Sequence, residues 1–236
     1  MNTMNPANTG TGLEADRALL GRTSTADRVA DILRTRIAEG FFPPGTRLAE
    51  DSIGGALGIS RNTLREAFRL LTHERLLSHE LNRGVFVRKL RVQDVVDLYR
   101  VRRLVECAAV RAVGPPPPDL RLAEQAVTDG EDAVRRQDFQ ALGTANMHFH
   151  QALAGLAGSP RVDELMRGVT AELRLVFHIM GDPRRFHEPY LVRNREILSA
   201  LQAGEGAAAE SLLDMYLDAA ERQIVDAYTE LTADPI

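Results

Sequence analysis

The chain has 236 residues, of which 44% are hydrophobic and 26% charged, a composition typical of globular proteins with one or two domains. No run approaches the ~18 apolar residues of a membrane span, and the N-terminus lacks the basic-then-apolar order of a secretory signal. Cys107 is the only cysteine, which excludes an intrachain disulfide. We therefore expect a cytoplasmic protein without membrane contact.

Charge is distributed unevenly along the chain. Residues 22–91 carry 13 Arg and Lys side chains against 8 Asp and Glu, whereas residues 92–236 carry 15 against 23. Apart from Lys89, every basic side chain is an arginine, whose planar guanidinium suits bidentate contacts with anions. A basic first third joined to an acidic remainder suggests one module for a polyanion and another for something else, with ordinary charge scatter as the alternative.

The first third of the chain predicts three helices and a β-hairpin. Residues 1–24 are rich in Asn, Thr and Gly, and we expect them to form a disordered tail. Apolar residues then recur at helical spacing, interrupted by the breaker-rich turn FFPPGTRL. The expected helices are 25–39, 49–60 and 60–77, and the expected hairpin spans 76–90 around LNRG.

The segment LGISR and the arginine-bearing helix after it have the spacing of a helix-turn-helix. Gly58 permits the tight turn, and Ser60 caps a helix whose N-terminal amides suit a phosphate. A solvated arginine face is the alternative for each arginine taken singly. The residues predicted to contact DNA, on this helix and on the hairpin as a wing, are Arg61, Asn62, Thr63, Arg65, Arg69, Arg83 and Gly84.

From residue 92 onward the pattern is helical, so we expect a mainly α protein with an all-α antiparallel bundle. The expected helices are 92–113, 119–136, 138–157, 160–180, 188–203 and 205–230. The buried face expected for the first of them is Val95, Leu98, Val101, Val105 and Ala108. The expected division is a winged helix-turn-helix DNA-binding domain over 25–90 and a helical effector-binding and dimerisation domain over 91–232.

The segment ANMHFH, residues 145–150, concentrates nitrogen and oxygen side chains on a predicted helix. Asn146 and His150 are four residues apart and share a face, whereas His148 points elsewhere. Such a pair is half of a metal or ligand site, the remnant of one, or a histidine packed on a helix.

Residues 25–88 resemble the winged helix-turn-helix of the GntR family of bacterial transcription regulators. The resemblance rests on P-P-G-x-R-L, on L-G-[VI]-S-R-x-[TP]-[VL]-R-E-A and on the wing N-R-G-x-F-V. It implies the family's usual DNA contacts at Arg61, Asn62, Thr63, Arg65, Arg83 and Gly84. Asp51 stands where some members carry a DNA-contacting arginine.

Residues 92–230 are similar to the all-helical, FCD-type effector domain of the FadR subfamily. The similarity rests on DLYRVRRLVECAAVR, NMHFHQALAGLAGSPRVDELM and NREILSALQAGEGAAAESLLDMYL. In that domain a cavity inside the bundle binds a small effector, often a carboxylate, and in many members a divalent metal. The usual ligands are an aspartate and three histidines.

The four corresponding positions are Asn146, His150, Asn194 and Tyr216, so only His150 is of the usual type. Losing the carboxylate and two imidazoles should remove most transition-metal affinity. The same four side chains could instead hold a polar organic effector directly. Arg102 is the candidate carboxylate clamp, or else an i, i+4 partner of Glu106.

The sequence therefore predicts a ligand-responsive, homodimeric, DNA-binding transcriptional regulator rather than an enzyme. Its expected partners are a double-stranded DNA operator and a small organic acid or related metabolite. One alternative is a regulator whose sensor cavity has degenerated, and another is a metal-binding helical-bundle enzyme. No cofactor is expected, with a divalent metal on His150, or on a rearranged site using His178 and His187, left as the alternative.

Overall fold

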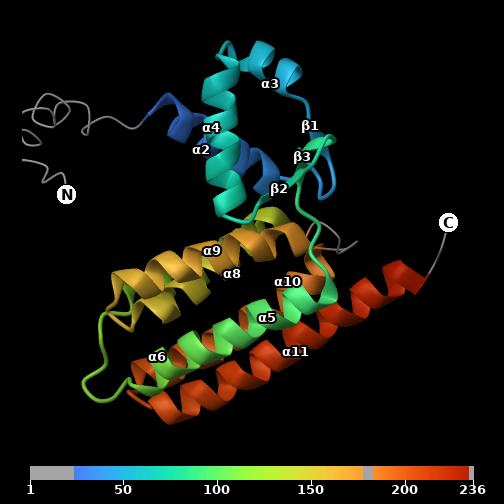
Figure 1. Cartoon of the computed structure of the whole chain (residues 1–236). Helices are drawn as coiled ribbons and strands as arrows, with labels where there is room; N and C mark the ends of the chain where they lie inside the picture. The colour runs from blue at the N-terminus through green and yellow to red at the C-terminus, as the bar shows by residue number, and fades with distance from the viewer. Residues whose placement is uncertain (1–23, 178–182, 234–236) are drawn as a thin grey trace, which may run out of the picture.

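The computed structural model describes residues 24–177 and 183–233, which form two bodies, one above the other (Figure 1). The tail expected over residues 1–24 lies outside them apart from Ser24. The mainly α fold is confirmed, and none of the described helices is long and apolar enough to cross a membrane.

The N-terminal body combines helices with a small antiparallel sheet in the strand order β1-β3-β2. Its elements are α2 (Thr25–Ala38), β1 (Arg47–Leu48), α3 (Glu50–Leu57), α4 (Arg61–His73), β2 (Leu77–Glu80) and β3 (Gly84–Val87). Ser24 caps α2 in a capping box with Asp27, and Gly58 closes α3 in the left-handed conformation at φ 64°. These local signals were readable in the sequence because capping chemistry involves neighbouring residues only.

Helix α4 begins as predicted and ends earlier than predicted. The Ser60 side chain accepts a hydrogen bond from the Thr63 amide, and the expected apolar face, Leu64, Ala67, Phe68 and Leu71, is buried. The helix stops at His73 rather than at residue 77, because Arg75 adopts φ 59° and the chain then enters β2.

Strand β1 was not predicted, since residues 41–48 were interpreted as a turn. Arg47 pairs with Phe86 and Leu48 with Val85 of β3, so the wing hairpin gains a third strand. A strand of two residues has no periodicity to detect, and it exists only because β3 offers it backbone partners. Leu48 is buried, which ties this short strand to the core of the domain.

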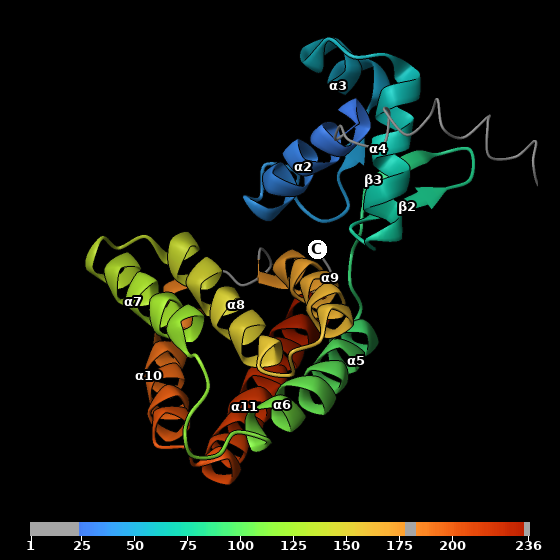
Figure 2. The same cartoon turned by 90° about the vertical axis from the view of Figure 1, so that its left-hand side faces the viewer.

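The C-terminal body is a bundle of helices (Figure 2). Its elements are α5 (Val92–Arg102), a π-helical segment (Arg103–Cys107), α6 (Ala108–Arg111), α7 (Arg121–Arg135), α8 (Phe139–Gly155), α9 (Pro160–Phe177), α10 (Pro183–Gln202) and α11 (Gly206–Ala233). Helix α8 lies in the middle and contacts α7, α9 and α10, while α5, α6 and α10 pack along α11. Residues 178–180 of a predicted helix, including His178, lie outside the described residues, and α10 begins five residues before the predicted position 188.

The buried face predicted for the helix beginning at residue 92 is partly confirmed, since Val101 and Val105 are half-buried and pack against the core. Val95 and Leu98 are buried as expected, but Ala108 is exposed, and Arg102 and Glu106 are buried in place of an apolar stripe. Arg102 and Glu106 follow Val95 and Leu98 at α-helical spacing, so they share the buried face, whereas the predicted stripe advanced mostly by three residues at a time and drifted off that face.

The two bodies are joined by an ion triad around Arg88, directly after β3. Its guanidinium donates to the Asp94 carboxylate at 2.8 Å, in the first turn of α5, and to the Glu172 carboxylate at 2.6 Å, on α9. Burial raises the pKa of Glu172 above its ordinary value, and the charge of Arg88 opposes this shift. Arg88 therefore fixes the wing to two helices of the bundle at once.

A second feature of the packing is His187 on α10, which is buried against the rings of Phe177 and Phe186 at centroid distances of 5.0 and 4.9 Å. A Cβ on Gly143 of α8 would lie 2.8 Å from its Nε2 atom, and its Nδ1 atom is buried without a hydrogen-bond partner. Burial, aided by the charge of Arg174, lowers the pKa of His187 to about 4.

We expect Arg88→Ala to lower the free energy of unfolding by about 1–3 kcal/mol, because Glu172 would lose its partner while remaining buried. Urea denaturation at neutral pH measures this loss. Arg91→Ala is the matched control, since Arg91 also pairs with Asp94 but is 79% exposed and should cost little. Equal losses in the two variants would contradict a structural role for the triad.

We also expect the stability to fall as the pH is lowered from about 6.5 towards 4. The unfolded chain protonates His187 near the ordinary histidine pKa, whereas the folded chain does not until about pH 4. The free energy of unfolding then falls by up to about 1.4 kcal/mol per pH unit in this window. His187→Gln should flatten that slope, whereas His148→Gln, at an exposed position, should not. Denaturation at several pH values across the window measures the slope. Identical slopes in the two variants would refute His187 as the origin of the pH dependence.

Candidate nucleic-acid interface and buried polar site

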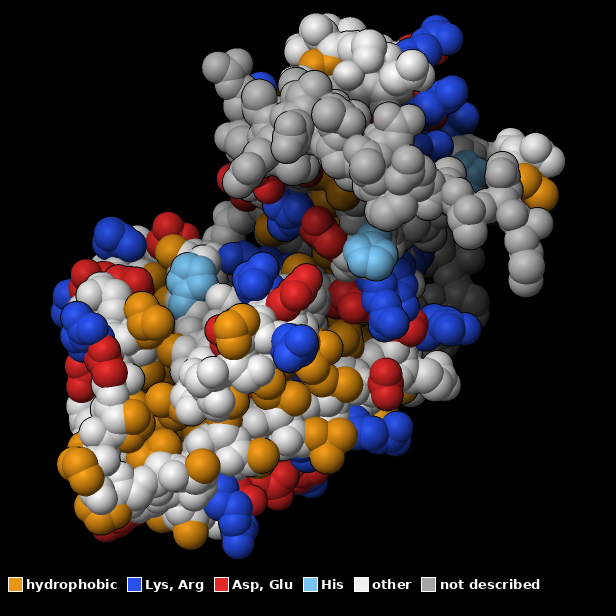
Figure 3. Space-filling model, turned by 60° about the vertical axis from the view of Figure 1, so that its left-hand side comes forward, with side chains coloured by type: hydrophobic (Ala, Val, Ile, Leu, Met, Phe, Trp, Pro, Cys, Tyr) orange, Lys and Arg blue, Asp and Glu red, His pale blue; other side chains and the backbone are white. Residues whose placement is uncertain are grey.

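Helix α4 presents arginines on the side opposite its buried face. The side chains of Arg61, Arg65 and Arg69 are 71, 58 and 79% exposed, and Asn62 beside them is exposed as well. Basic side chains follow one another along an edge of this domain in Figure 3. Thr63 is half-buried, and its hydroxyl lies 2.8 Å from that of Ser60 at the start of the helix. An exposed helix of this kind can enter a major groove with its first turns.

Each of these arginines contacts a nearby carboxylate. Arg61 pairs with Asp51 at 3.0 Å and Arg65 with Glu50 at 2.9 Å, both across the turn to α3, while Arg69 pairs with Glu66. Exposed pairs contribute little to stability, so a phosphate can replace the carboxylate at small cost. Asp51, at the position where some GntR members carry an arginine, thus holds Arg61 in place.

The wing supplies a second basic element, and α4 packs against its strand β2. Arg83 pairs with Glu80 and lies over the ring of Phe86, with 5.7 Å between the guanidinium carbon and the ring centroid. Gly84 has φ 108°, and a Cβ there would lie 3.3 Å from Nε of Arg47, so the backbone and this side chain approach closely.

Arg47 on β1 is a candidate contact that the sequence interpretation missed. Its side chain is exposed, lies over Gly84, and forms no ion pair within the described residues. The arginine of P-P-G-x-R-L was the available signal, but its placement beside the wing depends on the pairing of β1 with β3.

Inside the bundle, three of the predicted effector residues form one hydrogen-bonded group. The Asn194 amide donates to Oδ1 of Asn146 at 2.7 Å, and the Tyr216 hydroxyl donates to the same oxygen at 3.0 Å. The ring of Tyr216 also packs on that of His150, with centroids 4.7 Å apart. The structure therefore brings together, from α8, α10 and α11, the four positions that the resemblance selected.

The fifth predicted residue, Arg102, belongs to a buried triad. Its Nε atom donates to Glu106 at 2.7 Å, and the other carboxylate oxygen of Glu106 lies 2.6 Å from Nδ1 of His150. This is the i, i+4 pair that was weighed against a carboxylate clamp. Glu106 is fully buried and was missed as a site residue, because a carboxylate on a predicted helix face is usually solvated.

Charge in this triad is arranged around an ionised Glu106. Burial alone would raise the pKa of Glu106, but the charge of Arg102 and the hydrogen bonds from Arg102 and His150 bring it below its ordinary value. Burial and the charge of Arg102 lower the pKa of His150. We therefore assign a neutral imidazole that donates from Nδ1 to Glu106 and keeps an acceptor lone pair on Nε2.

Some polar atoms of this site remain unsatisfied. Three of them are buried without a hydrogen-bond partner: Nη2 of Arg102, Nε2 of His150 and Oδ1 of Asn194. Leaving a buried polar atom unpaired costs about 1–3 kcal/mol, so a bound molecule that satisfies all three would be stabilised. The three atoms are one unused donor and two unused acceptors.

These residues do not fit a divalent metal. Among the described residues, no three His, Cys, Asp or Glu side chains are grouped so that they could hold an ion. Oδ1 of Asn146 already accepts two hydrogen bonds, and burial raises the pKa of Tyr216, which keeps its hydroxyl a donor. His187, considered for a rearranged metal site, packs instead against the rings of Phe177 and Phe186.

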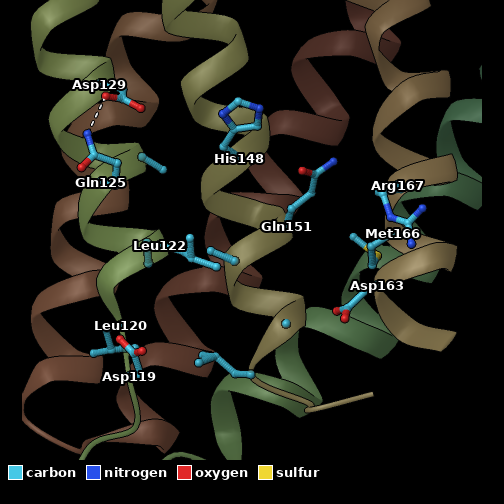
Figure 4. Close-up of a pocket in the computed structure, with 15 residues that line it drawn as sticks. Asp119, Leu120, Leu122, Gln125, Asp129, His148, Gln151, Asp163, Met166 and Arg167 are labelled. Carbon is cyan, nitrogen blue, oxygen red and sulfur yellow. Dashed lines mark hydrogen bonds between the residues drawn. The ribbon is translucent and has the colours of Figure 1, made fainter. Parts of the chain in front are cut away.

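His148 points away from the buried site, as the helical phase predicted. It lines a hollow of about 540 Å³ on the outer face of α7, α8 and α9. Figure 4 shows His148 and Gln151 of α8 between Asp129 and Gln125 of α7 on one side and Arg167 of α9 on the other. The two histidines of ANMHFH therefore lie in different environments. His148 lines the outer hollow, and only His150 belongs to the buried polar site.

Two sequence families match the chain. The bacterial regulatory proteins of the gntR family match residues 25–87, and the FCD domain matches residues 97–219. The Nta operon transcriptional regulator of Aminobacter aminovorans is 33% identical over 162 residues, covering 64% of this chain and 72% of that relative. The galactonate operon transcriptional repressor of Escherichia coli K12 is 27% identical over 206 residues, covering 78% of this chain and 90% of that relative.

Among solved structures, the crystal structure of a GntR transcriptional regulator from Rhodococcus sp. RHA1 is similar throughout. It is 52% identical in sequence, with a TM-score of 0.84, and the match covers 87% of this chain and all of that chain. The resemblance drawn from the motifs is therefore confirmed. The chain belongs to the GntR family of bacterial transcription regulators, with a winged helix-turn-helix for DNA and a helical FCD domain behind it.

Proposed function

We propose that this regulator binds a two-fold operator as a homodimer and that a small hydroxy acid controls its fit to the DNA. The DNA contacts come from α4 through Arg61, Asn62, Thr63, Arg65 and Arg69, and from the wing through Arg83, Gly84 and Arg47. The observation that carries the ligand proposal is the group of buried, unpartnered polar atoms at Arg102, His150 and Asn194.

These three atoms define the chemistry of the effector. Nη2 of Arg102 would donate to a carboxylate, while Nε2 of His150 and Oδ1 of Asn194 would accept from hydroxyl groups. Because Glu106 already neutralises Arg102, recognition depends on directional hydrogen bonds more than on net charge. Sugar acids carry this set of groups, and galactonate, after which the operon of one relative is named, is a sugar acid.

The path from the effector to the DNA runs along α5. This helix carries Arg102 near its C-terminal end and Asp94 in its first turn, and Asp94 binds Arg88 directly after the wing strand β3. A ligand that shifts α5 would therefore move the attachment of the wing, and with it the spacing of the two recognition helices of a dimer.

Two alternatives are distinguished by simple measurements. In a regulator with a degenerate sensor, no metabolite would bind among Arg102, His150 and Asn194, and DNA binding would be constitutive or controlled by another protein. In a bundle metalloenzyme, purified protein would contain stoichiometric metal by elemental analysis. The paired Glu-x-x-His motifs of such enzymes do not occur in this sequence.

The double substitution Arg61→Ala and Arg65→Ala should weaken operator binding by at least about tenfold, because base contacts are worth about 1–3 kcal/mol each. Each lost phosphate contact should also reduce the slope of log affinity against log salt by about 0.9. Gel-shift titrations on an operator selected from random DNA measure both. Arg36→Ala on α2, which removes another exposed, paired arginine, is the control; unchanged binding by the double variant would exclude α4 as the recognition helix.

A melting-temperature screen of hydroxy acids tests the effector site. An acid present at about 100 times its dissociation constant should stabilise the protein by about 2.7 kcal/mol. Asn194→Leu removes an unpartnered acceptor and should abolish the shift, whereas exposed Gln140→Leu on α8 should not. The shift should be the same with divalent metal or with a chelator. A screen without any stabilising acid would favour the degenerate sensor.

A further inference from the structure

A hollow lies between the DNA-binding domain and the bundle, beside the contacts that join them. Its volume is about 740 Å³, and α2 and α4 line one side while α8 and α9 line the other. In Figure 3 the junction of the two bodies is recessed and carries basic, acidic and histidine side chains. The residues that matter below are Arg34, Glu74, Glu164, Arg167 and Arg174.

Arg174 on α9 is a cation of this junction whose counterion is not among the described residues. It is half-buried, its guanidinium donates to the hydroxyl of Thr144, and within the described residues it forms no ion pair. Burial lowers the pKa of Arg174, in contrast to Arg34 and Arg102, whose carboxylate partners raise theirs. A partly desolvated cation without a counterion is unfavourable, and an anion in the hollow would relieve it.

The carboxylates around Arg174 are mostly engaged elsewhere. Asp31 and Glu74 both bind Arg34, the latter through two hydrogen bonds of 2.7 and 2.8 Å. A second hollow of about 650 Å³, also lined by Arg174, contains Glu39, which pairs with Arg36, and Asp138, which caps α8. Glu164 is the remaining carboxylate of the first hollow, and it lies on α9 ten residues before Arg174.

Arg167 extends the basic surface along the same helix. It lies seven residues before Arg174, which places it on the same face of α9, roughly 10 Å away along the axis. It also forms no ion pair within the described part of the chain. An anionic group at Arg174 would therefore leave Arg167 free to bind a second polar group of the same molecule.

We propose that this interdomain hollow binds a phosphorylated small metabolite, with the phosphate on Arg174 and the remaining polar groups near Arg167. Guanidinium groups form bidentate hydrogen bonds with phosphate oxygens. A volume of about 740 Å³ accommodates more than the phosphate itself. This site is separate from the buried polar site around Arg102, and it adjoins Arg34 and Glu74 of the DNA-binding domain directly.

A molecule bound there would contact both domains and so stabilise one of their relative positions. The contacts between α2 and α9 and the Arg88 triad define the position seen here. The regulator would thus respond to a phosphorylated compound independently of the hydroxy acid.

The test is calorimetric titration of the full-length protein at constant ionic strength. The probes are glucose 6-phosphate, inorganic phosphate and, as the uncharged control, glucose. Arg174→Gln should weaken glucose 6-phosphate binding by about tenfold or more, since it removes the charge-assisted hydrogen bonds of the guanidinium. Arg161→Gln, which removes an exposed arginine from the same helix, should leave the affinity unchanged.

Further variants keep the result interpretable. Arg174→Lys retains the charge without the planar fork and should bind with intermediate affinity, while operator binding confirms that each variant is folded. If glucose 6-phosphate binds more tightly than inorganic phosphate, the ligand is a phosphorylated metabolite. If both bind equally and Arg174→Gln abolishes both, the same site binds the free phosphate ion. Absence of phosphate binding, or binding that Arg174→Gln leaves intact, overturns the proposal whether or not a hydroxy acid binds near Arg102.

Discussion

The ion pair between Arg102 and Glu106, buried inside the bundle, is the constraint around which the sensor domain is arranged. Removing one member of such a pair costs about 3–5 kcal/mol, so the two must be retained together. Glu106 also accepts from His150, which fixes that imidazole as a neutral acceptor towards the interior. Glu106 lies one turn after Arg102 on the buried face of the same helical stretch, within the π-helical segment.

Ion pairs in the DNA-binding domain have the opposite character. Arg61, Arg65 and Arg69 are exposed. Each pairs with a carboxylate on its own helix or on the neighbouring helix α3. These ion pairs hold the guanidinium groups in position at little cost and can exchange for phosphate. The ion pair of Arg88 is intermediate in burial. Its partner Glu172 is buried, while the arginine itself remains partly accessible. The buried pairs therefore have a structural role, the exposed pairs leave their arginines available for the DNA contacts proposed above, and a half-buried triad lies between the domains.

Much of the N-terminal domain could be predicted because its signals are local. Ser24 and Ser60 cap helices through bonds to residues three positions away, and Gly58 adopts the left-handed conformation that ends α3. Strand β1 could not be predicted, since Arg47 and Leu48 become a strand only by pairing with Phe86 and Val85. Arg47 was missed as a candidate DNA contact for the same reason.

For this protein, the sequence by itself determined the family, the helical phase that separates His150 from His148, and the four positions that meet inside the bundle. The tertiary structure alone decided how those positions are used. It showed that Asn146 accepts from both Asn194 and Tyr216, that Glu106 neutralises Arg102, and that Arg174 forms no ion pair with any of the residues described. Periodicity and motifs report which residues share a face, whereas desolvation and hydrogen-bond partners depend on side chains that are distant in the chain.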